Sequence, residues 1–189
     1  MRATALALCL CIVGVSPLFA ADTPRFELGA GYTFMRDTDR SESFPGGWAV
    51  SASGNVNSWA GVVTELGGSH RSCDNCQRGP FATDRFRGTD LHVTVLTFLA
   101  GPRVASHANS LVTPFAQVLL GGSHIKGGLE WDGALNTGFT YQPGAGVDVR
   151  VAPGVAVRLQ GDYRIIRTSG RNNKESRFVA GVVLSRGTL

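Results

Sequence analysis

Apolar and polar residues alternate with a period of two in eight separate stretches of the chain, and this pattern restricts the possible folds more than any other feature. Side chains of a β-strand point to opposite faces in turn, so each stretch predicts a strand with one apolar face. The stretches are roughly 9–15 residues long, and a tilted strand needs about 9–11 residues to cross a bilayer. The predicted strands cover residues 26–35, 48–56, 60–69, 90–99, 113–126, 139–150, 155–165 and 177–185.

The opposite, polar faces of these strands combine glycines with charges of both signs. Such a set suits a narrow lumen filled by small residues and ion pairs, with the apolar faces turned outward to lipid. A soluble barrel or sandwich has the reverse arrangement. The expected lumen charge network consists of Glu27, Glu65, Asp148, Arg150, Arg158, Asp162 and Arg164.

The fourth predicted strand alternates like the first three, and the fifth is more apolar throughout. We expect Leu91, Val93, Val95 and Leu99 to face outward, and the opposite side, which includes His92, Leu96 and Phe98, to face the lumen. In the fifth, Ala116, Val118 and Leu120 should share one face and Gln117 and Ser123 the other.

Large aromatic residues lie at the strand ends next to the longer connections. Aromatic rings collect at membrane interfaces, where their apolar bodies meet lipid and their edges meet headgroups. We therefore expect an aromatic girdle at one height on the outer surface, formed by Tyr32, Phe34, Trp48, Phe139, Tyr141, Tyr163 and Phe178.

The predicted connections alternate between long and short, which is typical of barrels with long extracellular loops and short periplasmic turns. Turn residues such as Ala-Pro-Gly at positions 152–154 mark one of the tight connections. We expect long connections at residues 36–46, 71–88, 127–137 and 168–174, an intermediate one at 103–109 and tight turns at 55–58 and 151–154.

Composition agrees with this fold class. The mature chain has no run of about 18 apolar residues, so a helical membrane protein is excluded, and the 17% of charged residues is low for a disordered chain. Basic residues are scattered among acidic ones, which argues against a nucleic-acid surface. The sequence predicts an all-β, eight-stranded, antiparallel, up-and-down transmembrane β-barrel.

The first 21 residues have the pattern of a signal peptide: Arg2, an apolar run, then Pro17 and small residues at Ala20 and Ala21. The barrel domain is then expected at residues 22–189. Two cysteines remain after cleavage, Cys73 and Cys76, in a spacing shared by small disulfides, redox motifs and half of a zinc site. In an exported protein we interpret them as a loop disulfide.

Several stretches resemble the small outer-membrane barrels of the opacity-antigen and OmpA/OmpX-like group. They are Phe-Glu-Leu-Gly-Ala-Gly-Tyr (26–32), Pro-Phe-Ala-Gln-Val-Leu-Leu-Gly-Gly (114–122), Gln-Pro-Gly-Ala-Gly-Val-Asp-Val-Arg (142–150), Val-Ala-Val-Arg-Leu-Gln-Gly-Asp-Tyr-Arg (155–164) and Phe-Val-Ala-Gly-Val-Val-Leu (178–184). The resemblance implies a monomeric outer-membrane protein, inserted by the outer-membrane insertion machinery and in contact with outer-membrane lipid and lipopolysaccharide.

The residues point to a function without catalysis or cofactors. His70 and His124 each follow Gly-Gly-Ser and form the best candidate pair for a metal or a catalytic site, while His107 lies in a periplasmic connection and His92 fills the lumen. The longest loop carries Arg71, Arg78, Arg85 and Arg87; these charges suit either contact with an anionic surface or simple solvation of the barrel edge. We expect a structural or adhesion-like surface protein; the alternatives are a narrow gated pore and a soluble secreted barrel that binds a small apolar ligand.

Overall fold

The alternating segments form one continuous antiparallel sheet. A computed structural model describes residues 23–37, 43–44, 46–73, 91–127, 136–168 and 171–189. No helix long and apolar enough to cross a membrane occurs in the described part of the chain. The strands are β1 (Pro24–Asp37), β2 (Ser43–Phe44), β3 (Gly46–Asn55), β4 (Ala60–Cys73), β5 (Leu91–Ala105), β6 (Val112–Gly127), β7 (Asn136–Ala152), β8 (Val155–Thr168) and β9 (Arg171–Thr188).

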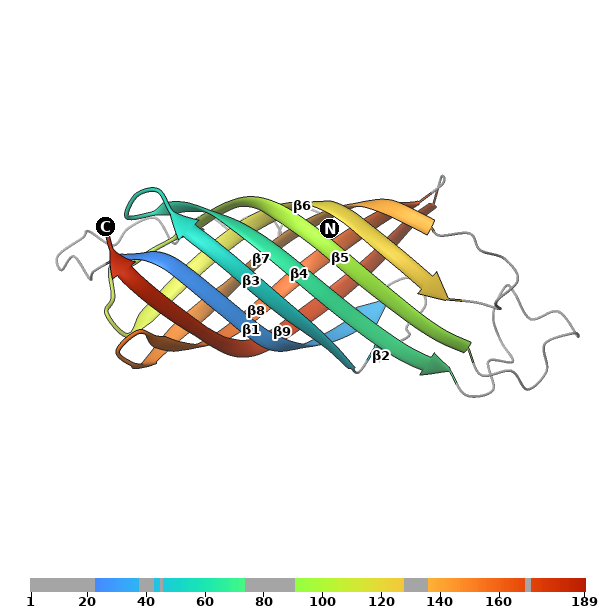
Figure 1. The fold of residues 1–189 in the computed structure, drawn as a ribbon, viewed down its shortest axis with the longest axis horizontal. Helices are drawn as coiled ribbons and strands as arrows, with labels where there is room; N and C mark the ends of the chain where they lie inside the picture. The colour runs from blue at the N-terminus through green and yellow to red at the C-terminus, as the bar shows by residue number, and fades with distance from the viewer. Residues whose placement is uncertain (1–22, 38–42, 45, 74–90, 128–135, 169–170) are drawn as a thin grey trace, which may run out of the picture.

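The sheet closes on itself as a barrel (Figure 1). From β3 onward each strand pairs with the next one in the chain, and β1 pairs with both β3 and β9. The two-residue β2 pairs with β1 at Met35 and Arg36 and continues the line of β3, so the wall has eight strands. The predicted fold class is confirmed.

Tight turns gather at one end of the barrel, which we call the turn end; the opposite end is the loop end. Pro153 and Gly154 alone join β7 to β8, and Gly154 has a φ of 72°, a left-handed conformation that glycine adopts without steric cost. Between β3 and β4, the Asn57 side-chain oxygen accepts the N–H groups of Trp59 and Ala60 at 3.0 and 2.7 Å. Such turns hold neighbouring strands in register.

The register also determines the tilt of the strands. A row of paired residues that leaves β1 at Leu28 passes through β3 to β8 and reaches β9 at Lys174. The next residue, Glu175, pairs with Asp37 of β1. One circuit of the barrel therefore climbs about ten residues along the strands, or slightly more than one residue per strand. This stagger determines which side chains of different strands lie at the same height.

The inward and outward faces follow the predicted alternation in seven strands, and β5 is the exception. Val95 and Leu99 are buried inside the barrel, whereas Leu96 and Phe98 are exposed on the outside, so the predicted faces of this strand are wrong. Because both faces carry large apolar residues, alternation alone did not distinguish them. Arg103 is four residues beyond Leu99, so both side chains point to the same face of β5. Because Arg103 is buried in the lumen, this face is the inward one.

Two predicted connections differ from the structure. The region 168–174 is not a long connection, because β8 and β9 remain paired as far as Thr168 and Arg171. Its run of polar residues resembles a loop in the sequence, but a strand that extends beyond the lipid needs no apolar face. Residues 103–105 belong to β5, so the intermediate connection covers residues 106–111.

Candidate functional site

Buried charges fill the lumen in two layers, and the layer nearer the turn end consists of Glu27, Arg103, Asp148 and Arg158. Arg103 donates from Nη1 to Glu27 Oε2 at 2.6 Å and from Nη2 to Asp148 Oδ2 at 2.9 Å. Arg158 donates two hydrogen bonds to the same Asp148 carboxylate, from Nε to Oδ1 at 2.7 Å and from Nη2 to Oδ2 at 2.8 Å. Its Nη2 also lies 3.5 Å from Glu27 Oε2. Two guanidinium groups thus neutralise two carboxylates away from water.

An aromatic ring supports this turn-end layer from β6. Phe115 is buried, and its ring centroid lies 4.2 Å from the Arg103 guanidinium carbon and 4.7 Å from that of Arg158. Stacking of a guanidinium on an aromatic face is favourable, and more so where water is excluded. Phe115 therefore holds both cations of the layer in place without using a hydrogen-bond acceptor.

The second layer, nearer the loop end, centres on Arg177. Its guanidinium contacts Asp162 Oδ2 at 2.6 Å and Glu65 Oε1 at 2.8 Å. Gln142 connects this group to a second cation: its Nε2 donates to Glu65 at 3.3 Å, and its Oε1 accepts from Arg164 Nε at 2.7 Å. We call these five residues the loop-end layer.

Between the two layers, little space remains. Val63, Leu99 and Leu119 fill the wall of β4 to β6 as a buried apolar cluster. On the opposite wall a cavity of about 20 Å³ lies beside Gly29, Glu65, Arg158 and Gln160, which is room for about one water molecule. In its described part, the lumen is packed from one layer to the next, as expected for a barrel of eight strands.

The structure brings most residues of the expected charge network into the lumen and leaves one outside. Arg150 shares the parity of Asp148 but is exposed at the turn end, where the strand has passed beyond the interior. The other residues of the predicted set are buried inside, namely Glu27, Glu65, Asp148, Arg158, Asp162 and Arg164.

Sequence reasoning missed three charges of the lumen: Arg103, Glu175 and Arg177, each at most 5% exposed. Arg103 falls in the predicted connection at 103–109, and Glu175 lies between the predicted connection at 168–174 and the predicted strand at 177–185, because both predicted strands are shorter than the observed ones. Arg177 was placed on the inward face but not included in the network. A signal was present for Arg103, since it continues the period-two series of Thr97 and Leu99.

All residues of the expected aromatic girdle are exposed on the outer surface. With the stagger of the barrel taken into account, all but Phe139 fall within about two residues of one height, and Phe139 lies about two residues nearer the loop end. Phe98, which the corrected face of β5 turns outward, has the same height and is 59% exposed. The band therefore continues across the wall formed by β5.

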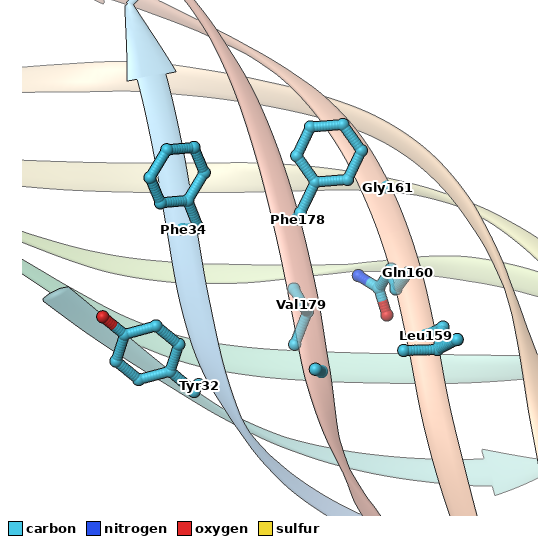
Figure 2. Close-up of a pocket in the computed structure, with 8 residues that line it drawn as sticks. Tyr32, Phe34, Leu159, Gln160, Gly161, Phe178 and Val179 are labelled. Carbon is cyan, nitrogen blue, oxygen red and sulfur yellow. The ribbon is translucent and has the colours of Figure 1, made fainter. Parts of the chain in front are cut away.

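A hollow of about 450 Å³ opens on the outer surface where β8, β9 and β1 meet (Figure 2). Its lining includes the small residues Gly161 of β8 and Ala180 of β9. Large side chains stand around them: Phe34 and Phe178 lie side by side at one end, with Tyr32 and Leu159 toward the other. The hollow is thus an apolar depression within the girdle band.

The histidines do not assemble a metal site among the described residues, where no group of three His, Cys, Asp or Glu could hold an ion. His70 of β4 lies 3.3 Å from Thr94 Oγ1, while His124 lies two strands away on β6. His107 Nδ1 is 3.0 Å from the Ser58 carbonyl oxygen and so links two turns at the turn end.

Three further expectations fall outside what the structure describes. These are the Cys73–Cys76 disulfide, the lumen position of the His92 side chain and the signal peptide at residues 1–21.

Comparison with known proteins identifies the barrel. Residues 5–185 match the family model described as "Outer membrane protein beta-barrel domain". The chain belongs to this family. Family membership places the protein in the bacterial outer membrane, with apolar strand faces toward lipid, and confirms the resemblance seen in the sequence. A search of curated protein sequences gave no match.

Solved structures of outer-membrane proteins share the fold of this family member. Neisserial surface protein A has a TM-score of 0.60 at 16% identity, covering 85% of this chain and 95% of that one. Ail, the attachment invasion locus protein of Yersinia pestis, crystallised with the heparin analogue sucrose octasulfate, has a TM-score of 0.51 at 14% identity, covering 84% and 95%. AlkL in lipid bilayers has a TM-score of 0.51 at 8% identity, covering 93% and 96%.

Proposed function

We propose that this outer-membrane barrel is a non-enzymatic, adhesion-like surface protein that acts through the segments joining its strands at the loop end. The observation that carries the proposal is the packed lumen. Because two layers of buried ion pairs and an apolar cluster occupy the interior, the barrel serves as a rigid support. The segments beyond the membrane then remain as the variable, accessible part of the molecule.

Charge in the longest of these segments suggests the chemistry of the partner. Residues 74–90 contain Arg78, Arg85 and Arg87, and Arg71 precedes them on β4. The same segment also contains three aspartates, Asp74, Asp84 and Asp90, so its net charge is zero. The guanidinium groups of its arginines can still bind sulfate or phosphate groups through paired N–H donors. We infer an anionic glycan of a neighbouring or host surface as the partner. The complex of Ail with a sulfated heparin analogue is a precedent within the same fold.

Binding of whole cells to immobilised heparin tests this function. Cells displaying the wild-type barrel should bind, and the variant R78Q/R85Q/R87Q should bind at the level of cells without the barrel. The matched control R25Q/R150Q/R186Q removes the same charge from exposed arginines at the turn end and should bind as the wild type does. Equal binding of all three proteins would refute the proposal.

The packed lumen argues against the two alternative functions. A gated pore would require buried pairs such as Arg103–Glu27 and Arg177–Glu65 to separate, and separation leaves charges without partners in a dry interior. A soluble barrel for an apolar ligand would require an apolar interior, whereas most of the buried lumen groups are polar or charged. We further propose that the protein is a monomer delivered by the outer-membrane insertion machinery.

A further inference from the structure

Three cations lie on the outer wall of the barrel directly beyond the apolar hollow. Arg36 of β1, Lys174 of β9 and Arg167 of β8 are all exposed. Arg36 pairs with Ser176, two residues from Lys174, and Lys174 pairs with Ile165, two residues from Arg167. The three positions therefore form a diagonal row that advances two residues along the strand at each step to the next strand.

The stagger of the barrel converts this diagonal into a nearly level row. A level line around the barrel already advances slightly more than one residue along each successive strand. The row of cations advances two residues per strand, so the three cations fall within about two residues of one height. They lie about three residues, or roughly 8 Å, closer to the loop end than Phe178 and Phe34. Since aromatic girdles mark the interface between lipid tails and headgroups, this row is at the level of the headgroups of the outer leaflet.

The row is specific to the wall that carries the hollow. On the described parts of β4 to β7, the outward positions within about one residue of this height are His70, Thr94, Leu96, His124 and Phe139. Neither lysine nor arginine is among these residues. Among the described residues at this height, permanent positive charge is therefore concentrated on the wall that carries the apolar depression.

This combination of features fits one class of ligand. We propose that the wall formed by β8, β9 and β1 binds lipid A, the bisphosphorylated and acylated disaccharide of the outer leaflet. Its phosphates contact Arg36, Lys174 and Arg167, whose backbone positions span two strand spacings and four residues along the strands, or about 16 Å. An acyl chain fills the hollow over Gly161 and Ala180. Basic residues at a membrane surface recognise anionic headgroups in this way.

Charge argues against a second copy of the barrel as the occupant of this wall. Two copies related by a two-fold axis along the membrane normal would face each other through the same surface. Their two cationic rows would then meet at one height, and like charges in contact oppose association. A lipid with two phosphates matches the charge of the row instead.

Native mass spectrometry of the full-length protein in detergent, titrated with purified lipid A, tests the proposal. We expect the R36Q/R167Q/K174Q variant to bind lipid A roughly a hundredfold more weakly, because each of the three surface cations contributes about a fivefold effect. The control R25Q/R150Q/R186Q should bind like the wild type, because its exposed arginines lie at the turn end.

A second variant tests the hollow by filling it. A Cβ at Gly161 would lie 3.8 Å from the Phe178 ring, an ordinary contact, so G161L should fold and occupy the space of the acyl chain. We expect it to weaken lipid A binding about fivefold or more. Retention of the gel-mobility shift between unheated and boiled samples verifies folding of every variant.

Several results would overturn the proposal. Two control lipids test the specificity for two phosphates: lipid A without its phosphates, and phosphatidylglycerol. If either bound as tightly as intact lipid A, the proposed specificity would be wrong. Equal loss of binding in the triple variant and its turn-end control would show a non-specific charge effect. Chemical crosslinking of a cysteine at position 161 to a second copy of the chain would make the wall an interface between barrels.

Discussion

Replacement of Arg103 by methionine should destabilise the barrel more than any exposed substitution. Arg103 is 2% exposed, and its two Nη atoms lie 2.6 and 2.9 Å from Glu27 and Asp148. Methionine keeps most of the length of the side chain but removes the charge. The turn-end layer then has two carboxylates and only Arg158 to neutralise them.

The size of the effect follows from this imbalance. Removal of one partner from a buried ion pair costs about 3–5 kcal/mol, because the remaining charge has lost its compensation. The contact of the guanidinium with the Phe115 ring, 4.2 Å from its centroid, is lost as well. We therefore expect R103M to lower the free energy of unfolding by about 3–5 kcal/mol.

Urea unfolding in lipid vesicles, followed by tryptophan fluorescence, measures the change. The double variant E27Q/R103M removes the unpaired carboxylate and should recover about 1–3 kcal/mol relative to the sum of the single variants. R150M, at an exposed arginine of the turn end, serves as the control and should change stability by no more than about 0.5 kcal/mol. If R103M cost no more than R150M, Arg103 would not be the group that holds the layer together.

Two further predictions test the packing of the lumen. Phe115→Leu should lower the free energy of unfolding by about 2 kcal/mol, because the ring stacks on two buried guanidinium groups; a loss below about 0.5 kcal/mol in the same urea assay would show that the stacking contributes nothing. Gly101→Ala should cost about 1–3 kcal/mol, since a Cβ there would clash with the Val118 carbonyl oxygen. Gly122→Ala, with open space around it, is the matched control, and equal melting temperatures of the two alanine variants would contradict the reasoning.

The architecture of the barrel was largely predictable because alternation is a local property. Glu27 and Leu28 are on opposite faces of β1 whatever the rest of the chain does, and the same holds for Arg158 and Leu159 on β8. Each of the eight segments has one face with polar and charged residues and one apolar face. A membrane barrel satisfies both faces, because the charges pair inside the lumen and the apolar residues contact lipid. The turn signal at Pro153 and Gly154 likewise acts within a few residues.

Alternation was insufficient where both faces have the same character or where the membrane ends. On β5, Val95 and Leu96 are equally suited to lipid and lumen, and only the contact of Arg103 with Glu27 shows which face is inward. Beyond the lipid, polar residues suit both faces, so the sequence did not show that β8 and β9 continue to Thr168 and Arg171.

The sequence by itself thus determined which residues face lipid and which face the lumen in most strands, because the side-chain direction of a strand repeats every two residues. Only the tertiary structure decided which residues of different strands contact each other. Arg103 and Glu27 are 76 residues apart in the chain, and Arg36, Lys174 and Arg167 become a level row only through the stagger of the closed sheet. Register across strands is set by the packing of the whole barrel, and no short stretch of sequence contains it.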